Sequence, residues 1–414
     1  MRKFRIPTVA LATALAATVL ASPSAAQRIT VERIFASNDF RLQGLAPRKW
    51  LSDGARYAIV ERSARTGATD LWIEDARSGE RKLLIDGKTL VPPGAREPIA
   101  IEDFDFSADE TKVLIFTNTQ RVWRENTKGT YYVYDLATKR LTPVSTRPGW
   151  QMFAKFSPDG TRVGFVRDHN IFVTDLRTGA ETQLTTDGSE TIINGTFDWV
   201  YEEELGLRDG WRWSPDGTKI AFWRLDQSPV RIFYMIDDLG LYSQPIPLRY
   251  PKAGEANSIA RIGVIDLADG SVVWIDTGAD TNVYLARMDW AASPDELVIQ
   301  RLNRHQNRLE VMLADVRTGR ARVIMTDKDE KWVDVDDDLT WIAGGTRFVW
   351  SSERDGYNHL YLFDREGRQI RKLTDGAWDV TEFYGVDEAN GWVYFAASEA
   401  SPLERQLYRV PLNG

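Results

Sequence analysis

Apolar and polar residues alternate in short runs along most of the chain, and a recurring turn sequence separates these runs. One full copy of the turn is Phe156-Ser157-Pro158-Asp159-Gly160, which stands before the alternating run at 163–166. Alternation with a period of two buries one face of a β-strand, proline presets φ, and Asp-Gly supplies the positive φ that a tight reversal needs. Each copy of this phrase therefore predicts a β-hairpin.

The phrase, in full or degenerate form, occurs seven times. Its copies begin at Trp50, Phe106, Phe156, Trp213, Trp290, Trp341 and Gly385. A second strand-turn-strand phrase follows each copy, so one repeat supplies two hairpins and a four-stranded sheet. Repeats of about 40 to 60 residues built from such sheets are typical of β-propeller blades, whereas a β-sandwich would not require one phrase at seven places. We therefore expect an all-β fold, a β-propeller of four-stranded blades, with an insertion in the widest interval, between Trp213 and Trp290.

The first 26 residues have the pattern of a secretory signal peptide. Basic residues Arg2, Lys3 and Arg5 precede an apolar run at 6–21, and small residues lead to a cleavage position after Ala26. The apolar run is shorter than the roughly 20 residues of a membrane span. We expect a signal peptide over 1–26, a lead-in segment over 27–45 and the propeller over 46–414. The protein is then exported, periplasmic or secreted, with no membrane span after signal removal.

Composition excludes several classes of protein. With 43% hydrophobic residues, 27% charged residues and no cysteine, the chain must fold around a packed core without disulfide bonds or cysteine-bound zinc. Acidic residues outnumber basic ones by 60 to 52, and a protein that reads nucleic acid usually presents a basic face. We expect no nucleic-acid partner.

The loops offer few candidates for chemistry. No G-x-S-x-G nucleophile motif occurs, and His169, His305 and His359 are far apart in the sequence. The acidic run at 334–338 lacks the glycine and the final glutamate of a calcium loop, so we interpret it as a solvated acidic turn. The sequence predicts no catalytic residue, no metal ion and no cofactor in this chain.

One segment interrupts the hairpin pattern. Residues 198–204 read Asp-Trp-Val-Tyr-Glu-Glu-Glu and stand just before the copy at Trp213. Consecutive glutamates favour a helix or a solvated turn, and the apolar residues before them would anchor that turn against the propeller. Two anchored carboxylates that face a cavity would bind a primary ammonium group through charge-assisted hydrogen bonds.

Segment 198–204 resembles the double-Glu motif of the dipeptidyl peptidase IV family, exported serine exopeptidases of the prolyl oligopeptidase type that remove Xaa-Pro dipeptides from peptide N-termini. Other phrases agree in the same order: Trp123-Arg124 ahead of 131–136, the copy at Trp213, Tyr-Pro-Lys-Ala-Gly at 250–254, and Asp-Gly-Tyr-Asn-His-Leu at 355–360. The resemblance, to the bacterial form of the family, runs from about the first blade to the last residue.

The resemblance implies roles for particular residues. Glu203 and Glu204 would bind the free α-ammonium of the substrate, which restricts such enzymes to N-terminal dipeptides. Arg124 would bind the carbonyl of the first peptide unit and offset the repulsion between the two glutamates. Supporting roles fall to Asp198, Trp199, Tyr201 and Glu202. The aromatic-arginine element that the family has in the loop after Trp332 is missing, and Asp336 stands near its place.

The resemblance also implies missing parts. Family members have eight blades followed by a hydrolase domain with a Ser, Asp and His triad. This sequence shows seven blade starts of an expected eight and no α/β-hydrolase domain. We interpret it as a propeller truncated at its C-terminal end, which would bind but not catalyse.

The partners that follow are the N-terminus of a peptide, the missing hydrolase domain and, in a homodimer, a second copy. The alternative hypothesis is a free-standing exported propeller that serves as a binding or interaction module. The reading frame past codon 414 separates the two hypotheses, because a continuing frame with G-W-S-Y-G-G or a similar motif would favour the first.

Overall fold

The computed structural model describes residues 29–42 and 48–413. The predicted signal peptide, 1–26, lies outside the described residues. The chain divides into two compact units, residues 1–47 and 48–414. In the first unit, helix α1 (Val31–Phe35) is capped by Thr30, whose side-chain oxygen accepts a hydrogen bond from the Arg33 backbone N–H at 3.2 Å.

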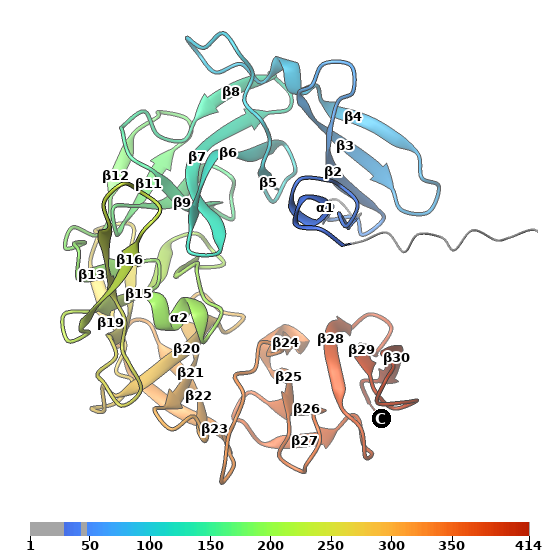
Figure 1. The fold of residues 1–414 in the computed structure, drawn as a ribbon. Helices are drawn as coiled ribbons and strands as arrows, with labels where there is room; N and C mark the ends of the chain where they lie inside the picture. The colour runs from blue at the N-terminus through green and yellow to red at the C-terminus, as the bar shows by residue number, and fades with distance from the viewer. Residues whose placement is uncertain (1–28, 43–47, 414) are drawn as a thin grey trace, which may run out of the picture. The chain divides into compact units, whose positions relative to one another are not determined.

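The second unit is a series of antiparallel sheets that follow one another in chain order (Figure 1). The first sheet contains β1 (Arg48–Trp50), β2 (Arg56–Arg62), β3 (Thr69–Asp75) and β4 (Arg81–Ile85). The second contains β5 (Asp103–Phe106), β6 (Lys112–Val122), β7 (Glu125–Asp135) and β8 (Arg140–Pro143). The third contains β9 (Gln151–Phe156), β10 (Arg162–Arg167), β11 (Asn170–Asp175) and β12 (Glu181–Gln183).

The fourth sheet contains β14 (Trp211–Trp213), β15 (Lys219–Asp226), β18 (Ile259–Asp266) and β19 (Val272–Trp274), and β13 (Ile192–Asn194) also pairs with β15. The fifth contains β20 (Val283–Trp290), β21 (Glu296–Asn303), β22 (Arg308–Asp315) and β23 (Ala321–Lys328). The sixth contains β24 (Thr340–Ile342), β25 (Arg347–Ser352), β26 (His359–Asp364) and β27 (Gln369–Lys372). The seventh contains β28 (Val380–Asp387), β29 (Trp392–Ala397) and β30 (Gln406–Pro411).

These sheets confirm the predicted fold. Each of the seven copies of the turn phrase joins the first and second strands of one sheet, as between β9 and β10. The second and third sheets are continuous, because β7 also pairs with β9 at Lys128↔Met152 and Gly129↔Gln151. Helical structure in the described residues is limited to α1, α2 (Trp199–Glu203) and two short 3-10 turns, η1 (Gly87–Thr89) and η2 (Ala343–Gly345), and these residues contain no α/β-hydrolase domain.

The repeated turn closes through its own side chains. Ser157 donates to Asp159 at 2.5 Å and accepts from the Arg162 backbone N–H at 3.0 Å. Gly160 has a φ of 65°, in the left-handed region that glycine adopts readily. In the second sheet the same turn has Glu110 at a φ of 54° in place of the glycine, which explains how a degenerate copy still forms the hairpin.

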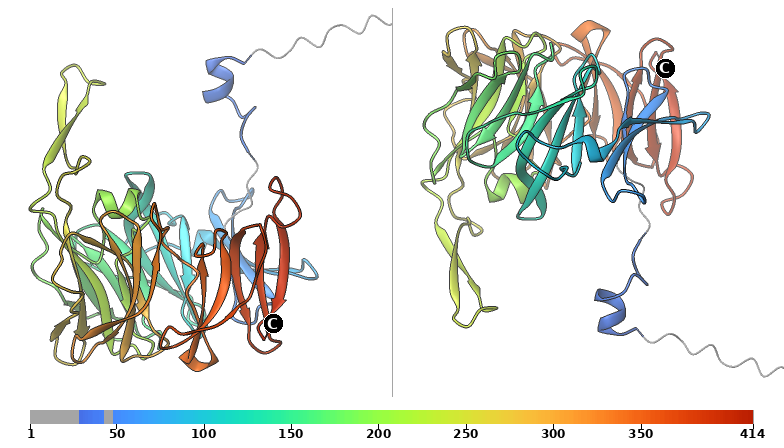
Figure 2. Two further views of the ribbon diagram at one scale, coloured as in Figure 1. Left: turned by 90° about the horizontal axis from the view of Figure 1, so that it is seen from below. Right: turned by 90° about the horizontal axis from the view of Figure 1, so that it is seen from above.

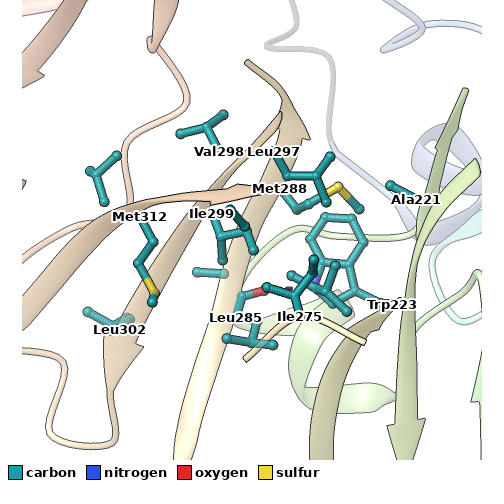
Figure 3. Packing of buried hydrophobic residues seen from close by; sticks show 14 of the residues in the cluster. Ala221, Trp223, Ile275, Leu285, Met288, Leu297, Val298, Ile299, Leu302 and Met312 are labelled. Atoms are coloured by element: carbon teal, nitrogen blue, oxygen red, sulfur yellow. Dashed lines mark hydrogen bonds between the residues drawn. The ribbon is translucent and has the colours of Figure 1, made fainter. Parts of the chain in front are cut away.

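Neighbouring sheets pack face to face through five buried apolar clusters. The largest cluster joins the fourth, fifth and sixth sheets, and Trp223 of β15 meets Met288 of β20 within it (Figure 3). The Trp223 indole N–H donates to the Leu285 carbonyl at 2.9 Å, so this contact between sheets is polar as well as apolar. Among the described residues, no cluster joins the first sheet to the seventh.

The predicted insertion between Trp213 and Trp290 is a two-stranded hairpin of β16 (Ile232–Asp237) and β17 (Gln244–Arg249). The hairpin extends away from the sheets (Figure 2), and every residue of β16 is exposed.

Candidate functional site

Helix α2 carries the acidic segment and lies between β13 and β14. Asp198 is its N-cap residue and accepts a hydrogen bond from the Tyr201 backbone N–H at 3.0 Å. The Ser258 hydroxyl donates to the other oxygen of the same carboxylate. Burial raises the pKa of Asp198, although these donors lower it. Asp198 is therefore a structural residue that fixes where the helix begins.

Aromatic residues anchor α2 to two sheets, as the sequence predicted for the residues before the glutamates. Tyr201 is fully buried, stacks on Phe197 at 5.4 Å between ring centroids, and accepts a hydrogen bond from the Leu285 backbone N–H at 3.0 Å. Leu285 belongs to β20 of the next sheet. Trp199 contacts Tyr250 edge to face at 4.4 Å. A helix of little more than one turn is unstable alone, and these contacts hold it in place.

Glu203 forms an ion pair with Arg124, which lies in the two-residue turn between β6 and β7. The Arg124 Nε donates to Glu203 Oε1 at 2.9 Å and to Oε2 at 2.7 Å. The arginine side chain is 73% exposed, whereas that of Glu203 is 14% exposed. Trp123, in the same turn, has a φ of 52°, a conformation that costs energy for a residue with a Cβ atom. The structure brings together two predicted residues that are 79 positions apart.

Glu202 points to a different partner, Arg208, and is only 6% exposed. The Arg208 Nε donates to Glu202 Oε1 at 3.2 Å, and Arg208 Nη2 lies 3.5 Å from Glu125 Oε1. Burial raises the pKa of Glu202, Arg208 lowers it, and the nearby Glu203 and Glu125 charges raise it. Glu202 is thus a buried residue that packs at the site and pairs with Arg208.

Glu204 is the C-cap of α2 and is exposed. Within the part of the chain that the structure describes, its carboxylate takes part in no ion pair or side-chain hydrogen bond. The local cluster of charges comprises two guanidinium groups and four carboxylates, namely Arg124, Arg208, Glu125, Glu202, Glu203 and Glu204. Its net charge is negative, which suits a cationic ligand.

A cavity of about 510 Å³ lies at the start of α2. Its lining residues are Trp199, Phe233, Met235, Leu248, Tyr250, Lys252 and Ala253. The cavity therefore joins the helix to the base of the inserted hairpin. Glu203 and Glu204 are not among its lining residues, so the expected cavity in front of these two carboxylates is a different space from this one.

The acidic run at 334–338 differs from the solvated turn that we predicted. Asp336 is buried, and it accepts hydrogen bonds from the backbone N–H groups of Ser351 and Asp338. Burial and the neighbouring Asp338 charge raise the pKa of Asp336 well above its ordinary value. Asp337 is exposed and pairs with Arg287 of β20. The prediction was wrong because Asp336 packs against β25 and is buried there. The acidic composition of the run does not reveal which of its carboxylates is buried.

The same run lines a cavity of about 520 Å³ together with Trp332, Glu353 and Arg354. Within residues 29–42 and 48–413, no group of three or more histidine, aspartate or glutamate side chains is arranged to hold a metal ion. In the same residues, no helix is both long and apolar enough to span a membrane.

The successive antiparallel sheets, most of them four-stranded, with one short helix inserted between β13 and β14, define a β-propeller with a charged site on an interrupted blade. The chain belongs to the dipeptidyl peptidase IV family, because the model of the dipeptidyl peptidase IV N-terminal region matches residues 107–414. The chain is the propeller portion of that family's architecture.

Relatives agree with this assignment. The crystal structure of Porphyromonas gingivalis dipeptidyl peptidase 4 superposes with a TM-score of 0.84 at 31% identity, over 93% of this chain and 54% of that one. A protein of Emericella nidulans named probable dipeptidyl-aminopeptidase B is 30% identical over 403 residues, which is 87% of this chain and 43% of the relative. Probable dipeptidyl peptidase 4 of Aspergillus fumigatus is 31% identical over 340 residues, 78% of this chain and 44% of the relative. The chain thus spans less than half the length of these curated relatives.

Sequence reasoning missed two charged residues of the site, Arg208 and Glu125. Arg208 is six positions after Glu202. A single basic residue so close to three consecutive glutamates was the sequence feature that could have predicted this ion pair. Glu125 is next to Arg124, and only the hairpin geometry shows that it faces Arg208. Ser258 and Leu285, which hold Asp198 and Tyr201, gave no sequence signal because they lie 60 and 84 positions away.

Proposed function

We propose that this chain is the propeller and substrate-gating part of an exported dipeptidyl peptidase IV-like serine exopeptidase that removes Xaa-Pro dipeptides from peptide N-termini. Glu203 and Glu204 bind the free α-ammonium group of the peptide. The observation that carries the proposal is the pairing of Arg124 with Glu203, next to Glu204, whose carboxylate has no ion-pair partner among the described residues. That arrangement unites the two motifs that the family resemblance singled out.

The charges favour an ammonium ligand. Among the described residues, only the Arg124 side chain donates to the Glu203 carboxylate. A carboxylate has about four lone-pair sites, so Glu203 can accept further hydrogen bonds. A primary ammonium can donate to Glu203 and Glu204 together, and such charge-assisted hydrogen bonds contribute about 1.5 to 3 kcal/mol each. An N-acetylated peptide carries no positive charge and has fewer donors, so the site rejects it.

Arg124 serves the same peptide in a second way. Its Nε is committed to Glu203, while the side chain as a whole is largely exposed. The remaining guanidinium N–H groups can therefore donate to the carbonyl of the first peptide unit. Anchoring of the amino terminus and of this carbonyl would fix the distance from the terminus to the bond that is cut, which yields dipeptides.

In this proposal the propeller binds the N-terminus of the peptide, and a separate hydrolase domain catalyses the cleavage. The test uses the complete protein that contains this chain, with a chromogenic Xaa-Pro substrate. Glu203→Gln and Glu204→Gln should each lower kcat/KM by about 10-fold to 100-fold, the equivalent of one charge-assisted hydrogen bond.

The matched control is Glu190→Gln, which alters an exposed glutamate paired with Arg249 and should leave kcat/KM unchanged. Unchanged kinetics in both Glu203→Gln and Glu204→Gln would contradict the ammonium site. Absence of Xaa-Pro cleavage by the wild-type protein would overturn the proposed activity itself.

A second copy of the chain is a further part of the proposal, supported by the inserted hairpin. Isolated two-stranded hairpins are marginally stable in water, and Tyr234 and Ile236 of β16 are each 57% exposed. An exposed apolar surface of this kind marks an interaction site.

Light scattering should show that the wild-type protein is a dimer and that the double variant Tyr234→Lys with Ile236→Lys is a monomer. The control Leu403→Lys, at another exposed apolar position, should remain dimeric. A monomeric wild-type protein would contradict this part.

A further inference from the structure

Two ion pairs of opposite polarity connect the segment that contains helix α2 with the hairpin of β6 and β7. In the first, the turn supplies the cation, Arg124, and the helix supplies the carboxylate, Glu203. In the second, the first residue of β7, Glu125, supplies the carboxylate, and Arg208, five residues after the end of the helix, supplies the cation. Because Arg124 and Glu125 are consecutive, the turn is held at two adjacent points.

Arg208 also reaches into the interior. It donates to Glu202 at 3.2 Å, and the Glu202 side chain is only 6% exposed, whereas the Glu125 side chain is 59% exposed. Arg208 therefore bridges one buried carboxylate on the helix and one exposed carboxylate at the start of β7. Its own side chain is one quarter exposed, and among the described residues its ion pairs are to these two carboxylates and not to Glu204.

Glu202 needs this cation. The charged groups that face Glu202 are Arg208, Glu203 on the same helix and Glu125 on β7. Burial and both carboxylates oppose its ionisation, and Arg208 alone among these groups favours it. Removal of one partner from a buried ion pair is strongly destabilising because the remaining charge is uncompensated.

We propose that Arg208 is a positioning residue for the peptide site, which ties the turn that carries Arg124 to the helix that carries Glu203 and Glu204. This inference rests on the proposed function. Arg208 does not touch the peptide: it sets the separation between the carbonyl-binding guanidinium and the ammonium-binding carboxylates. A displacement of about 1 Å in such an arrangement is enough to weaken productive binding severely.

Two variants separate this role from a role in stability alone. In Arg208→Ala with Glu202→Gln, the buried charge is removed together with its partner, so thermal stability should return to near that of the wild type. The tie to Glu125 stays broken, so the KM for an Xaa-Pro substrate should stay about tenfold above the wild-type value, with kcat changed by less than about threefold. Glu125→Gln breaks only the exposed contact and should raise KM by about threefold with an unchanged melting temperature.

The experiment measures KM, kcat and melting temperature in the complete protein for these two variants, for Arg208→Lys, for Glu203→Gln and for the surface control Glu190→Gln. Arg208→Lys keeps one positive charge at this position. Its melting temperature should therefore be close to the wild-type value, and its KM should lie between those of the wild type and the double variant. If the double variant and Glu125→Gln both show wild-type KM while Glu203→Gln does not, Arg208 is only a structural residue and the inference is wrong. If Glu203→Gln also has a wild-type KM, or the wild-type protein cleaves no Xaa-Pro substrate, the proposed function fails, and this inference fails with it.

Discussion

The repeated hairpin turns and the site around α2 use carboxylates in opposite ways. In the second sheet, Asp109 accepts from Ser107 and Thr111, its neighbours two positions away, and hydrogen bonding led by Ser107 lowers its pKa to about 2. At the site, Glu203 finds its partner 79 positions away, and Glu202 is buried with a raised pKa. The turn is stabilised by hydrogen bonds between neighbouring residues, whereas the site forms only after segments that are far apart in the sequence have packed together.

The turns and the site therefore differ in what a substitution there should affect. Each turn closes one hairpin, so we expect its loss to harm one blade and to leave the proposed peptide site unchanged. The site is held by buried contacts such as Tyr201 with Leu285, so we expect damage to an anchor to harm both stability and the proposed binding. Arg124 is largely exposed, so we expect its substitution to affect the proposed binding with little effect on stability.

The largest expected effect is at the anchor of α2. Tyr201→Ala removes a fully buried ring and the acceptor of the Leu285 N–H, so the free energy of unfolding should fall by about 3 to 5 kcal/mol. Tyr201→Phe removes only the acceptor and should cost about 1 to 3 kcal/mol. Chemical denaturation measures both, and equal stability of Tyr201→Phe and the wild type would show that α2 is not held as described.

A turn serine should have a smaller effect that is confined to stability. Ser157→Ala leaves the Arg162 backbone N–H without its side-chain acceptor and should lower the free energy of unfolding by about 1 kcal/mol. Ser214→Ala, in the equivalent turn before Lys219, should match it. Peptide affinity should not change in either variant. A loss of affinity at Ser157 would break the separation between turns and site.

The acidic run gives a pH-dependent prediction. The pKa of Asp336 in the folded protein is raised above the ordinary value of 3.8 by burial, so the folded state binds more protons than the unfolded state in that range. Its contribution to stability is therefore full below pH 3.8 and is lost as the pH rises through the raised pKa. Asp336→Asn should be more stable than the wild type at pH 7, and the difference should shrink toward pH 4. A difference that is independent of pH would contradict the burial of an ionisable Asp336.

The smallest expected effect on stability is at Arg124. Its side chain is mostly exposed, and exposed ion pairs contribute about 0 to 1 kcal/mol. Arg124→Ala should therefore leave the melting temperature nearly unchanged while it weakens binding of a dipeptide mimic at least tenfold, a larger loss than Arg371→Ala, at a surface position, would cause. Equal effects of the two substitutions on binding would contradict the role of Arg124.

The sequence predicted the seven sheets because each hairpin is encoded by residues close together, such as Ser157, Asp159 and Gly160. It also located α2, since Trp199 and Tyr201 beside three glutamates break the repeat. It did not predict the burial of Asp336 or the role of Arg208, because both depend on strands that arrive from elsewhere in the chain. The resemblance to the dipeptidyl peptidase IV family, and not the spacing of residues in the sequence, placed Arg124 and Glu203 in the same site.

The central claim is that the carboxylates of α2 recognise the free amino terminus of a peptide. The most direct measurement compares kcat/KM of the complete protein for one Xaa-Pro peptide with a free and with an acetylated N-terminus, in the wild type and in Glu203→Gln with Glu204→Gln. The wild type should prefer the free terminus by at least about 100-fold, the equivalent of two charge-assisted hydrogen bonds, and the double variant should largely lose this preference. A double variant that still prefers the free terminus as strongly as the wild type would contradict the claim.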